Sequence, residues 1–377
     1  MEQQTNSSST KSFEYLDILE ALALATIEEV IIELHRQVAY PPGKDTHIRN
    51  CYEALQMLLE VNSSVRLLLE NVLNMRGITA KHFVSLFFRS VQYIELYHRQ
   101  GAGYPAVLVR SEDWKNELAI LVEDYGDLLT DLLSTRFTNT TLYQRYAGPK
   151  AVLSALYSRS PVTVVDLGCG ANHGLPGIKG REPFHPIVDQ TSRQLFANLL
   201  DLPLVLQGIA VDRENPYSSE FRQWLLACSL YPTELYRLPA FSDFCDRVAT
   251  IDGIRFYQAD LLALSSHLLT NEGLMDVDAV ILSTVLYQYD IRERRILLAL
   301  AKSMLKPHGI LIIQDFAWID PNDPQDLIFS KNWFGSPYPY RTFITGSSFG
   351  WNMQECFQWN SSRCLLVKEG NNLNQVL

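Results

Sequence analysis

Five short runs of apolar and β-branched residues alternate with longer stretches of helical pattern in the second part of this chain. An alternation of this kind is typical of a parallel sheet whose strands are joined by helices. Two later runs flank the turn-forming residues 360–362 and predict an antiparallel hairpin at an edge of the sheet. We therefore expect an α/β fold with a seven-stranded sheet. The predicted strands are Val162–Leu167, 205–211, Ile254–Gln258, 279–283, 310–314, 353–359 and 364–368.

The first part of the chain has apolar residues three and four positions apart, which predicts amphipathic helices. Tyr52, Leu55 and Leu58 follow this spacing, and the turn-forming residues 62–64 are expected to end their helix. The pattern changes at about residue 158. The expected organisation is a disordered tail over 1–12, a helical N-terminal domain over 13–158 and a second domain over 159–377.

Composition and charge narrow the classes of function. The chain is 47% hydrophobic and 20% charged, which is ordinary for a folded soluble protein, and its formal net charge of −10 argues against a nucleic-acid partner. Glutamates interrupt the apolar stretch 16–34, so it predicts an amphipathic helix and no membrane span. The six cysteines form no C-x-x-C pair and lack clustered histidines. We therefore expect no metal site, buried free thiols and a cytoplasmic location.

The first predicted strand runs directly into Gly168-Cys169-Gly170. Glycines at this place let the backbone turn sharply and come close to a bound nucleotide. Asp166 ends the strand, and together with Cys169 it belongs to the predicted binding loop, which extends to Gly174. The alternative is a tight turn between a strand and a helix that binds nothing.

The second strand leads to Asp212, whose carboxylate is placed to accept hydrogen bonds from both hydroxyls of a ribose. A structural alternative is that Asp212 caps the turn at 215–216. The separation between Asp166 and Asp212 is more than twice the roughly 20 positions of a compact nucleotide-binding βαβ unit. An insertion over 175–200 is therefore expected.

The third strand leads to Ala259-Asp260-Leu261. Asp260 is placed to accept a hydrogen bond from the amino group of adenine, while Ala259 lends its backbone amide and Leu261 lies beside them. The alternative for Asp260 is to cap the helix that follows.

The fourth and fifth strands supply the remaining predicted site residues. Ser283 and Thr284 end the fourth strand, and the segment that follows, including Tyr287, is expected to face the reacting group, because ligands of open parallel sheets bind beyond the carboxyl ends of the strands. The ring of Tyr287 either contacts a cation or packs against other apolar side chains. Asp315 ends the fifth strand and is a candidate general base, substrate anchor or cap. His173 is either a base or a cap of the glycine loop.

In order and content these motifs resemble class I S-adenosylmethionine-dependent methyltransferases over 161 to about 368. The resemblance implies a Rossmann-like sheet of order 3-2-1-4-5-7-6 and S-adenosylmethionine as the cofactor. It implies that Asp166, Gly168 and Gly170 lie at the methionine end of the cofactor, Asp212 at the ribose and Asp260 at the adenine.

A closer resemblance is to the uncharacterised domain-of-unknown-function family 2332, in which a helical portion precedes the same fold. Residues 128–139 and 224–228, with Pro232 following, carry it. Thr140 and Gly170 depart from the family's pattern, which tends to have an acidic residue and a small non-glycine residue at these places.

The expected function is methyl transfer from S-adenosylmethionine to an oxygen or nitrogen atom of a small molecule, with the aromatic segment 333–340 as a lid. Two alternatives keep the fold: a non-catalytic nucleoside-binding or interaction protein, and a protein methyltransferase. An NAD-dependent oxidoreductase is disfavoured because His173 stands where the dinucleotide motif wants a small residue.

Overall fold

The computed structural model describes residues 25–99, 104, 106–139, 141–185, 193–316, 340–370 and 372–373, so the tail expected over 1–12 lies outside the described residues. The chain divides into two compact units. Unit 1 consists of Met1–Thr140 and Gln223–Phe241, and unit 2 of Thr141–Arg222 and Ser242–Leu377. None of the helices described has both the length and the apolar character that crossing a bilayer requires.

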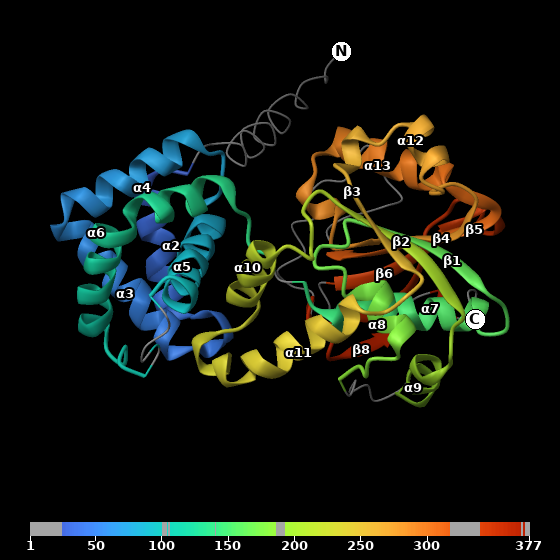
Figure 1. Ribbon diagram of the computed structural model, residues 1–377, viewed down its shortest axis with the longest axis horizontal. Helices are drawn as coiled ribbons and strands as arrows, with labels where there is room; N and C mark the ends of the chain where they lie inside the picture. Colours follow the sequence, from blue (N-terminus) through green and yellow to red (C-terminus); the bar gives the residue numbers. More distant parts are fainter. Residues whose placement is uncertain are drawn as a thin grey trace, which may run out of the picture. The chain divides into compact units, whose positions relative to one another are not determined.

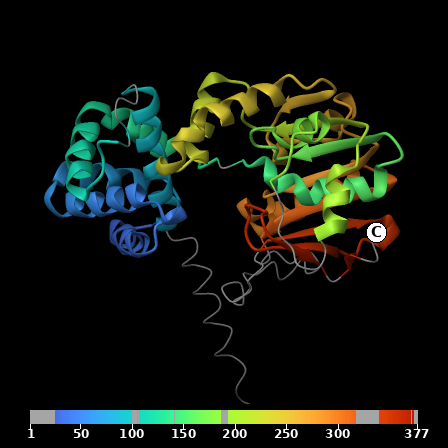
Figure 2. The ribbon, with the colours of Figure 1, turned by 90° about the horizontal axis from the view of Figure 1, so that it is seen from below.

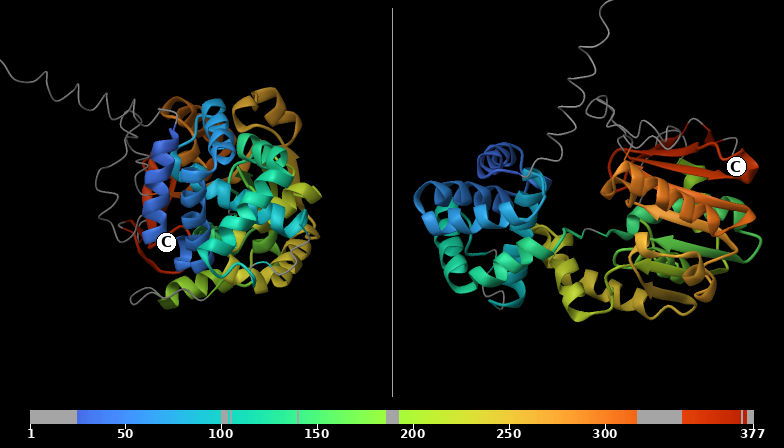
Figure 3. Two further views of the ribbon diagram at one scale, coloured as in Figure 1. Left: turned by 90° about the vertical axis from the view of Figure 1, so that its left-hand side faces the viewer. Right: turned by 90° about the horizontal axis from the view of Figure 1, so that it is seen from above.

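All regular elements among the described residues of unit 1 are helices (Figure 3). Asp45, Asn62 and Thr79 cap the second, third and fourth of its helices by accepting hydrogen bonds from backbone amides of the first turn. Asn62 confirms the break expected at 62–64. The helices are α2 (Ile27–Ala39), α3 (Thr46–Val61), α4 (Ser63–Met75), α5 (Ala80–Tyr97) and α6 (Ser111–Thr135).

A segment from the second half of the sequence completes unit 1. It contains the end of α10 (Ser219–Ser229) and the 3-10 helix η3 (Pro232–Arg237). Trp224 is buried in the helical core, and its indole nitrogen donates to the carbonyl of Phe137 at 2.8 Å. Gln92 in α5 donates to a backbone carbonyl of α10 at 2.6 Å. The helical unit is therefore discontinuous in sequence, whereas we expected one continuous domain.

The boundary of the helical unit also differs from the predicted residue 158. Thr141 begins unit 2, which therefore includes α7 (Ala147–Tyr157). Ala151 and Val152 of α7 are buried in a core shared with the sheet. A helical pattern alone does not distinguish a helix that packs on other helices from one that packs on a sheet.

Unit 2 contains an eight-stranded mixed sheet of order β3-β2-β1-β4-β5-β6-β7-β8 (Figure 1). The first five strands pair in parallel with one another, as expected. β1 and β3 have the predicted bounds, β2 is shifted by one residue, β4 begins two residues earlier and β5 is longer at both ends. The strands are β1 (Val162–Leu167), β2 (Leu206–Asp212), β3 (Ile254–Gln258), β4 (Val277–Ser283), β5 (Leu305–Phe316), β6 (Tyr340–Gly346), β7 (Gln354–Trp359) and β8 (Val367–Glu369).

The last three strands correct the predicted order 3-2-1-4-5-7-6. β6, which we did not predict, pairs antiparallel with β5, and β7 then pairs antiparallel with β6. Only 347–353 separate β6 from β7, and a connection this short joins antiparallel neighbours. The hairpin expected around 360–362 is confirmed as β7 and β8, with Trp359 opposite Val367.

Helices cover both faces of the sheet (Figures 1 and 2). One buried core joins a face of the sheet to α7, α8 (Gly174–Gly180) and α9 (Arg193–Asp201). A second core joins the other face to α12 (Ser266–Asn271) and α13 (Ile291–Ser303). The insertion expected over 175–200 contains all but the first residue of α8 and all but the last residue of α9. α11 (Leu238–Ala249), whose first residues belong to unit 1, precedes β3.

Candidate functional site

The glycine loop after β1 has the backbone conformation that the sequence predicted. Gly168 and Gly170 have φ values of +75° and +57°, in the left-handed region that favours glycine. A Cβ atom on Gly168 would lie 2.6 Å from Val285 Cγ2, and one on Gly170 would overlap the hydroxyl of Thr141. The same hydroxyl accepts a hydrogen bond from the amide of Ala171 at 3.2 Å. The loop thus closes tightly on the chain that follows β4 and on the start of unit 2.

Asp212 holds the glycine loop from the end of β2. One carboxylate oxygen accepts from the amide of Gly170 at 2.7 Å, and the other accepts from the amide of Glu214 at 3.3 Å. Burial raises the pKa of Asp212. A carboxylate oxygen can accept two hydrogen bonds, so Asp212 orders the loop and the turn after β2 and still has capacity for a hydroxyl donor.

Asp166 is a buried carboxylate at the end of β1. Its Oδ2 accepts a hydrogen bond of 2.8 Å from the hydroxyl of Tyr146, whereas its Oδ1 has no partner. Burial raises the pKa of Asp166 to about 7. Sequence reasoning missed Tyr146, because it lies in the part assigned to the helical domain and no local pattern pairs it with β1.

Asp260 caps a 3-10 turn, η4 (Leu261–Ala263), by accepting from the amide of Leu262 at 2.9 Å, so the capping alternative is present in the structure. The side chain is exposed and its second oxygen stays available. Ala259 requires a correction. Its amide donates to the carbonyl of Asp212 at 2.9 Å, and this hydrogen bond between strands uses the proton that we had assigned to adenine. The buried side chain of Leu261 lies beside Gly168.

The end of β4 is strained and polar. Thr284 has a φ of +60°, which is unusual for a β-branched residue and costs of order 1–3 kcal/mol. Its hydroxyl lies 2.5 Å from the hydroxyl of Tyr340, and its amide donates to the carbonyl of Gln314 at 2.8 Å. The buried hydroxyl of Ser283 has no partner. Tyr340 begins β6, and the other residues expected in the lid, 333–339, lie outside the described residues.

Asp315 and Tyr287 lie together where β4 and β5 end. The buried carboxylate of Asp315 accepts from the amide of Phe316 at 2.8 Å and from the amide of Tyr287 at 3.4 Å. Burial raises the pKa of Asp315 to about 7. The ring of Tyr287 packs edge-on against Phe316 at 5.2 Å between centroids. The packing alternative for Tyr287 and the capping alternative for Asp315 are therefore both present, and Asp315 stabilises the turn η5 (Leu286–Gln288).

His173 occupies a different environment from the other two predicted acid–base residues. It is buried, its Nε2 lies 3.4 Å from the Cys245 sulfur, and its ring packs edge-on against Phe244 at 5.0 Å. Burial lowers the pKa of His173 to about 3, so the imidazole is neutral at physiological pH. These contacts come from α11 and tie the end of the glycine loop to that helix.

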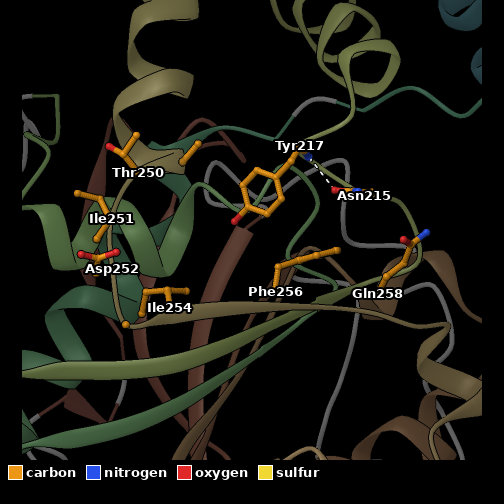
Figure 4. Close-up of a pocket in the computed structure, with 10 residues that line it drawn as sticks. Asn215, Tyr217, Thr250, Ile251, Asp252, Ile254, Phe256 and Gln258 are labelled. Atoms are coloured by element: carbon orange, nitrogen blue, oxygen red, sulfur yellow. Dashed lines mark hydrogen bonds between the residues drawn. The ribbon is translucent and has the colours of Figure 1, made fainter.

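An open hollow of about 580 Å³ runs along the edge strand β3 (Figure 4). Tyr217 points over the strand, with its ring edge-on to Phe256 at 5.8 Å between centroids. Its hydroxyl accepts from the side-chain amide of Asn172, in the glycine loop, at 2.8 Å. Gln258 lines the hollow and is the register partner of Asp212, so the hollow begins beside the glycine loop.

Three buried polar atoms near this end of the sheet have no hydrogen-bond partner among the described residues. They are Oδ1 of Asp166, Oδ1 of Asn172 and the hydroxyl of Ser283. They lie on β1, on the glycine loop and on β4, which pairs with β1. Buried polar groups are normally hydrogen-bonded, so such a group needs a partner that these contacts do not supply. The arrangement fits a polar ligand that donates hydrogen bonds.

All six cysteines are buried and free, as expected.

No family model and no curated protein matches the chain. Similar solved structures include PKMT2 from Rickettsia typhi in complex with S-adenosylhomocysteine, at 17% identity over 45% of this chain and 25% of that chain, with a TM-score of 0.25. The N-methyltransferase NodS from Bradyrhizobium japonicum, also with S-adenosylhomocysteine, is 16% identical over 46% of this chain and 61% of that chain, with a TM-score of 0.25.

A third structure is a TehB-like S-adenosylmethionine-dependent methyltransferase from Corynebacterium glutamicum, at 13% identity over 53% of this chain and 74% of that chain, with a TM-score of 0.27. This chain thus spans a quarter of the length of PKMT2 and 61% of NodS. At such TM-scores the similarities carry no argument about activity or substrate.

Proposed function

We propose that this chain binds S-adenosylmethionine and transfers its methyl group to an oxygen or nitrogen atom of a small molecule. The observation that carries the proposal is the buried carboxylate of Asp166, which has one oxygen without a partner and lies beside two left-handed glycines. The ammonium group of the cofactor's methionine end supplies a charged donor for that oxygen. When bound, S-adenosylmethionine supplies a methyl group on a positively charged sulfur.

The other predicted residues divide between the two ends of the cofactor. Asp212 accepts the ribose hydroxyls while its existing hydrogen bond to Gly170 keeps the loop in place. Asp260 accepts the amino group of adenine, and Leu261 packs near the ring. Cys169, Ser283 and Thr284 contact the methionine end.

Methyl transfer from a sulfonium needs alignment of the acceptor more than it needs a base. Where the acceptor carries a proton, Asp315 and Tyr287 are the predicted acid–base residues that lie at the carboxyl ends of β4 and β5. A carboxyl group with a pKa near 7 has the acidity that suits a general base at neutral pH. His173 serves instead to order the glycine loop.

One observation favours the non-catalytic alternative. The carboxylate of Asp315 already accepts two backbone hydrogen bonds, and His173 is buried and neutral. A protein that only binds a nucleoside has no need of a free base.

Three further predictions remain open. They are a protein as the methyl acceptor, membership of family 2332 and a cytoplasmic location.

Calorimetry with S-adenosylhomocysteine tests the cofactor, and NAD is the control ligand. Binding of S-adenosylhomocysteine without binding of NAD is expected, and a preference for NAD contradicts the proposal. Incubation of the full chain with isotopically labelled S-adenosylmethionine and metabolite extracts then tests catalysis. Label found only in protein favours a protein methyltransferase, and tight cofactor binding without any transfer favours the non-catalytic alternative.

A further inference from the structure

A second cavity of unit 2, of about 450 Å³, lies among α7, α8 and α9. This volume is in the range of small-molecule sites, which span about 300–1,000 Å³. Tyr143, Lys150 and Phe196 line the cavity together with the end of α8 and the chain that leads into β2. The described residues that line it include none of the strand ends discussed above, so the cavity is separate from the proposed cofactor site.

Lys150 is the polar group that defines this cavity. The residue is 5% exposed, and its ammonium donates to the hydroxyl of Ser154 at 2.8 Å and to the carbonyl of Leu202. Both acceptors are neutral, and an ammonium has three protons. In the part of the chain that the structure describes, no carboxylate forms an ion pair with it. Lysine is rarely buried without an anionic partner.

The charges around Lys150 leave the cavity positive. Arg181, at the end of α8, lines it as well. Glu182 is neutralised, because both of its carboxylate oxygens accept hydrogen bonds of 3.0 Å from Arg247. The carboxylate that remains is Asp201, an exposed lining residue whose charge acts on the pKa of Lys150 against the effect of Arg181. Burial and the charge of Arg181 lower the pKa of Lys150 to about 8, so its ammonium is mostly protonated at pH 7.

Aromatic rings form the apolar wall of the cavity. Tyr143 and Phe184 stack with their centroids 4.4 Å apart and their planes at 15°. The hydroxyl of Tyr143 donates to the carbonyl of Glu182 at 3.0 Å, so the residue offers the cavity its ring. Phe196 and Ile178 add buried apolar surface.

We propose that this cavity binds a small organic anion that joins an acidic group to a flat apolar body. The anion lies against Lys150 and Arg181, and the body packs on the aromatic wall. Its acidic group is a carboxylate, a sulfonate or a phosphate, all of which pair with an ammonium and a guanidinium. The site is independent of the proposed methyl transfer.

The test uses 8-anilinonaphthalene-1-sulfonate, a fluorescent aromatic sulfonate, as the probe on the full chain. Lys150→Met keeps the length of the side chain and removes its charge. We expect this variant to bind the probe at least 10-fold more weakly than the wild type. The uncharged analogue N-phenyl-1-naphthylamine, which has the same rings without the sulfonate, is expected to bind both proteins equally.

Two further variants keep the test decisive if Lys150→Met does not fold. Arg181→Gln changes an exposed residue, and we expect it to weaken binding of the sulfonate about 3-fold. Arg159→Gln, also exposed but outside the cavity, is the matched control and is expected to leave binding unchanged. Equal affinity of the wild type and of the Lys150 and Arg181 variants overturns the proposal. Displacement of the probe by S-adenosylhomocysteine also overturns it, because the probe then occupies the cofactor site.

Discussion

The hydroxyl of Tyr146 donates a hydrogen bond of 2.8 Å to Oδ2 of the buried Asp166 carboxylate. Tyr146 lies just before α7 and Asp166 at the end of β1, so the hydrogen bond joins the entry of unit 2 to the glycine loop. It favours the ionised carboxylate, yet burial has the larger effect, and the pKa of Asp166 is raised to about 7. Ionisation of Asp166 thus falls in the physiological pH range.

The affinity for S-adenosylhomocysteine is expected to depend on the ionisation of Asp166. The ammonium of the ligand binds the ionised carboxylate, so affinity falls as the pH is lowered through about 7, by up to about 10-fold per pH unit. Asp166→Asn is expected to bind weakly and without this dependence. Calorimetry between pH 5.5 and 8.5 measures both, with the exposed Asp243→Asn as the control. A wild type whose affinity does not change with pH contradicts the role of Asp166.

The same substitution is expected to stabilise the protein at high pH. Because the folded pKa of Asp166 lies above its unfolded value of 3.8, the free energy of unfolding falls as the pH rises from about 4 to about 7. Asp166→Asn removes this loss, so at pH 8 its free energy of unfolding is expected to exceed that of the wild type by up to roughly 4 kcal/mol. The variant should then also unfold at a higher temperature. At pH 4 the two proteins should unfold alike. Thermal unfolding at both pH values measures the difference.

Tyr146→Phe is expected to weaken ligand binding at pH 7 and much less at pH 8.5. Without the hydroxyl, the pKa of Asp166 rises further, and a hydrogen bond to a charged group contributes about 1.5–3 kcal/mol. Tyr157→Phe is the matched control, because its hydroxyl donates to the carbonyl of Asp278 at 3.1 Å, away from Asp166. If both variants bind as the wild type does at pH 7, Tyr146 has no part in the site.

Asp212→Ala is expected to reduce the affinity for S-adenosylhomocysteine about 10- to 150-fold, equivalent to roughly 1.5–3 kcal/mol. The loss combines the contact with the ribose and the hydrogen bond that orders Gly170. Asp212→Asn keeps one acceptor oxygen and should fall between the wild type and Asp212→Ala. Calorimetry at pH 8 ranks the three proteins, and equal affinities rule out the ribose assignment.

Gly168→Ala is expected to destabilise unit 2, because its φ of +75° disfavours alanine and the new Cβ would lie 2.6 Å from Val285. We expect a loss of about 2 kcal/mol or more. Gly126→Ala is the control within α6, where the nearest atom, in Leu68, lies at an ordinary 3.6 Å. Alanine is the better helix former there, by about 0.5–1 kcal/mol. Thermal unfolding is the measurement, and a neutral Gly168→Ala contradicts the tight loop.

The strands of unit 2 could be predicted from the sequence where the local hydrophobic pattern matches the packing of the strand in the sheet. β1 has the predicted bounds, since an apolar run is typical of a strand buried on both faces. β3 also has the predicted bounds, although it is an edge strand with no fully buried residue. β6 was missed because its aromatic start resembled a loop that could cover a site. Its pairing with β5 depends on contacts across the sheet that spacing along the chain does not encode.

The candidate site was predictable only where residues follow strands directly. Asp166, Gly168 and Asp212 could be placed because parallel strands bring their carboxyl ends to one edge of the sheet. Tyr146 could not, because no local pattern pairs it with β1. Ala259 was assigned wrongly because sequence alone did not indicate which amides the strand pairing uses.

The divided sequence of unit 1 also has a consequence for synthesis. At about 5–20 residues per second, a ribosome needs roughly 5–20 s to pass from Thr140 to Phe241. During that interval the emerging helices lack Trp224, and Arg89 and Gln92 lack the carbonyls that they bind in the finished protein. The N-terminal helices therefore cannot complete their core until the ribosome has also made β1 and β2, which precede this segment in the sequence.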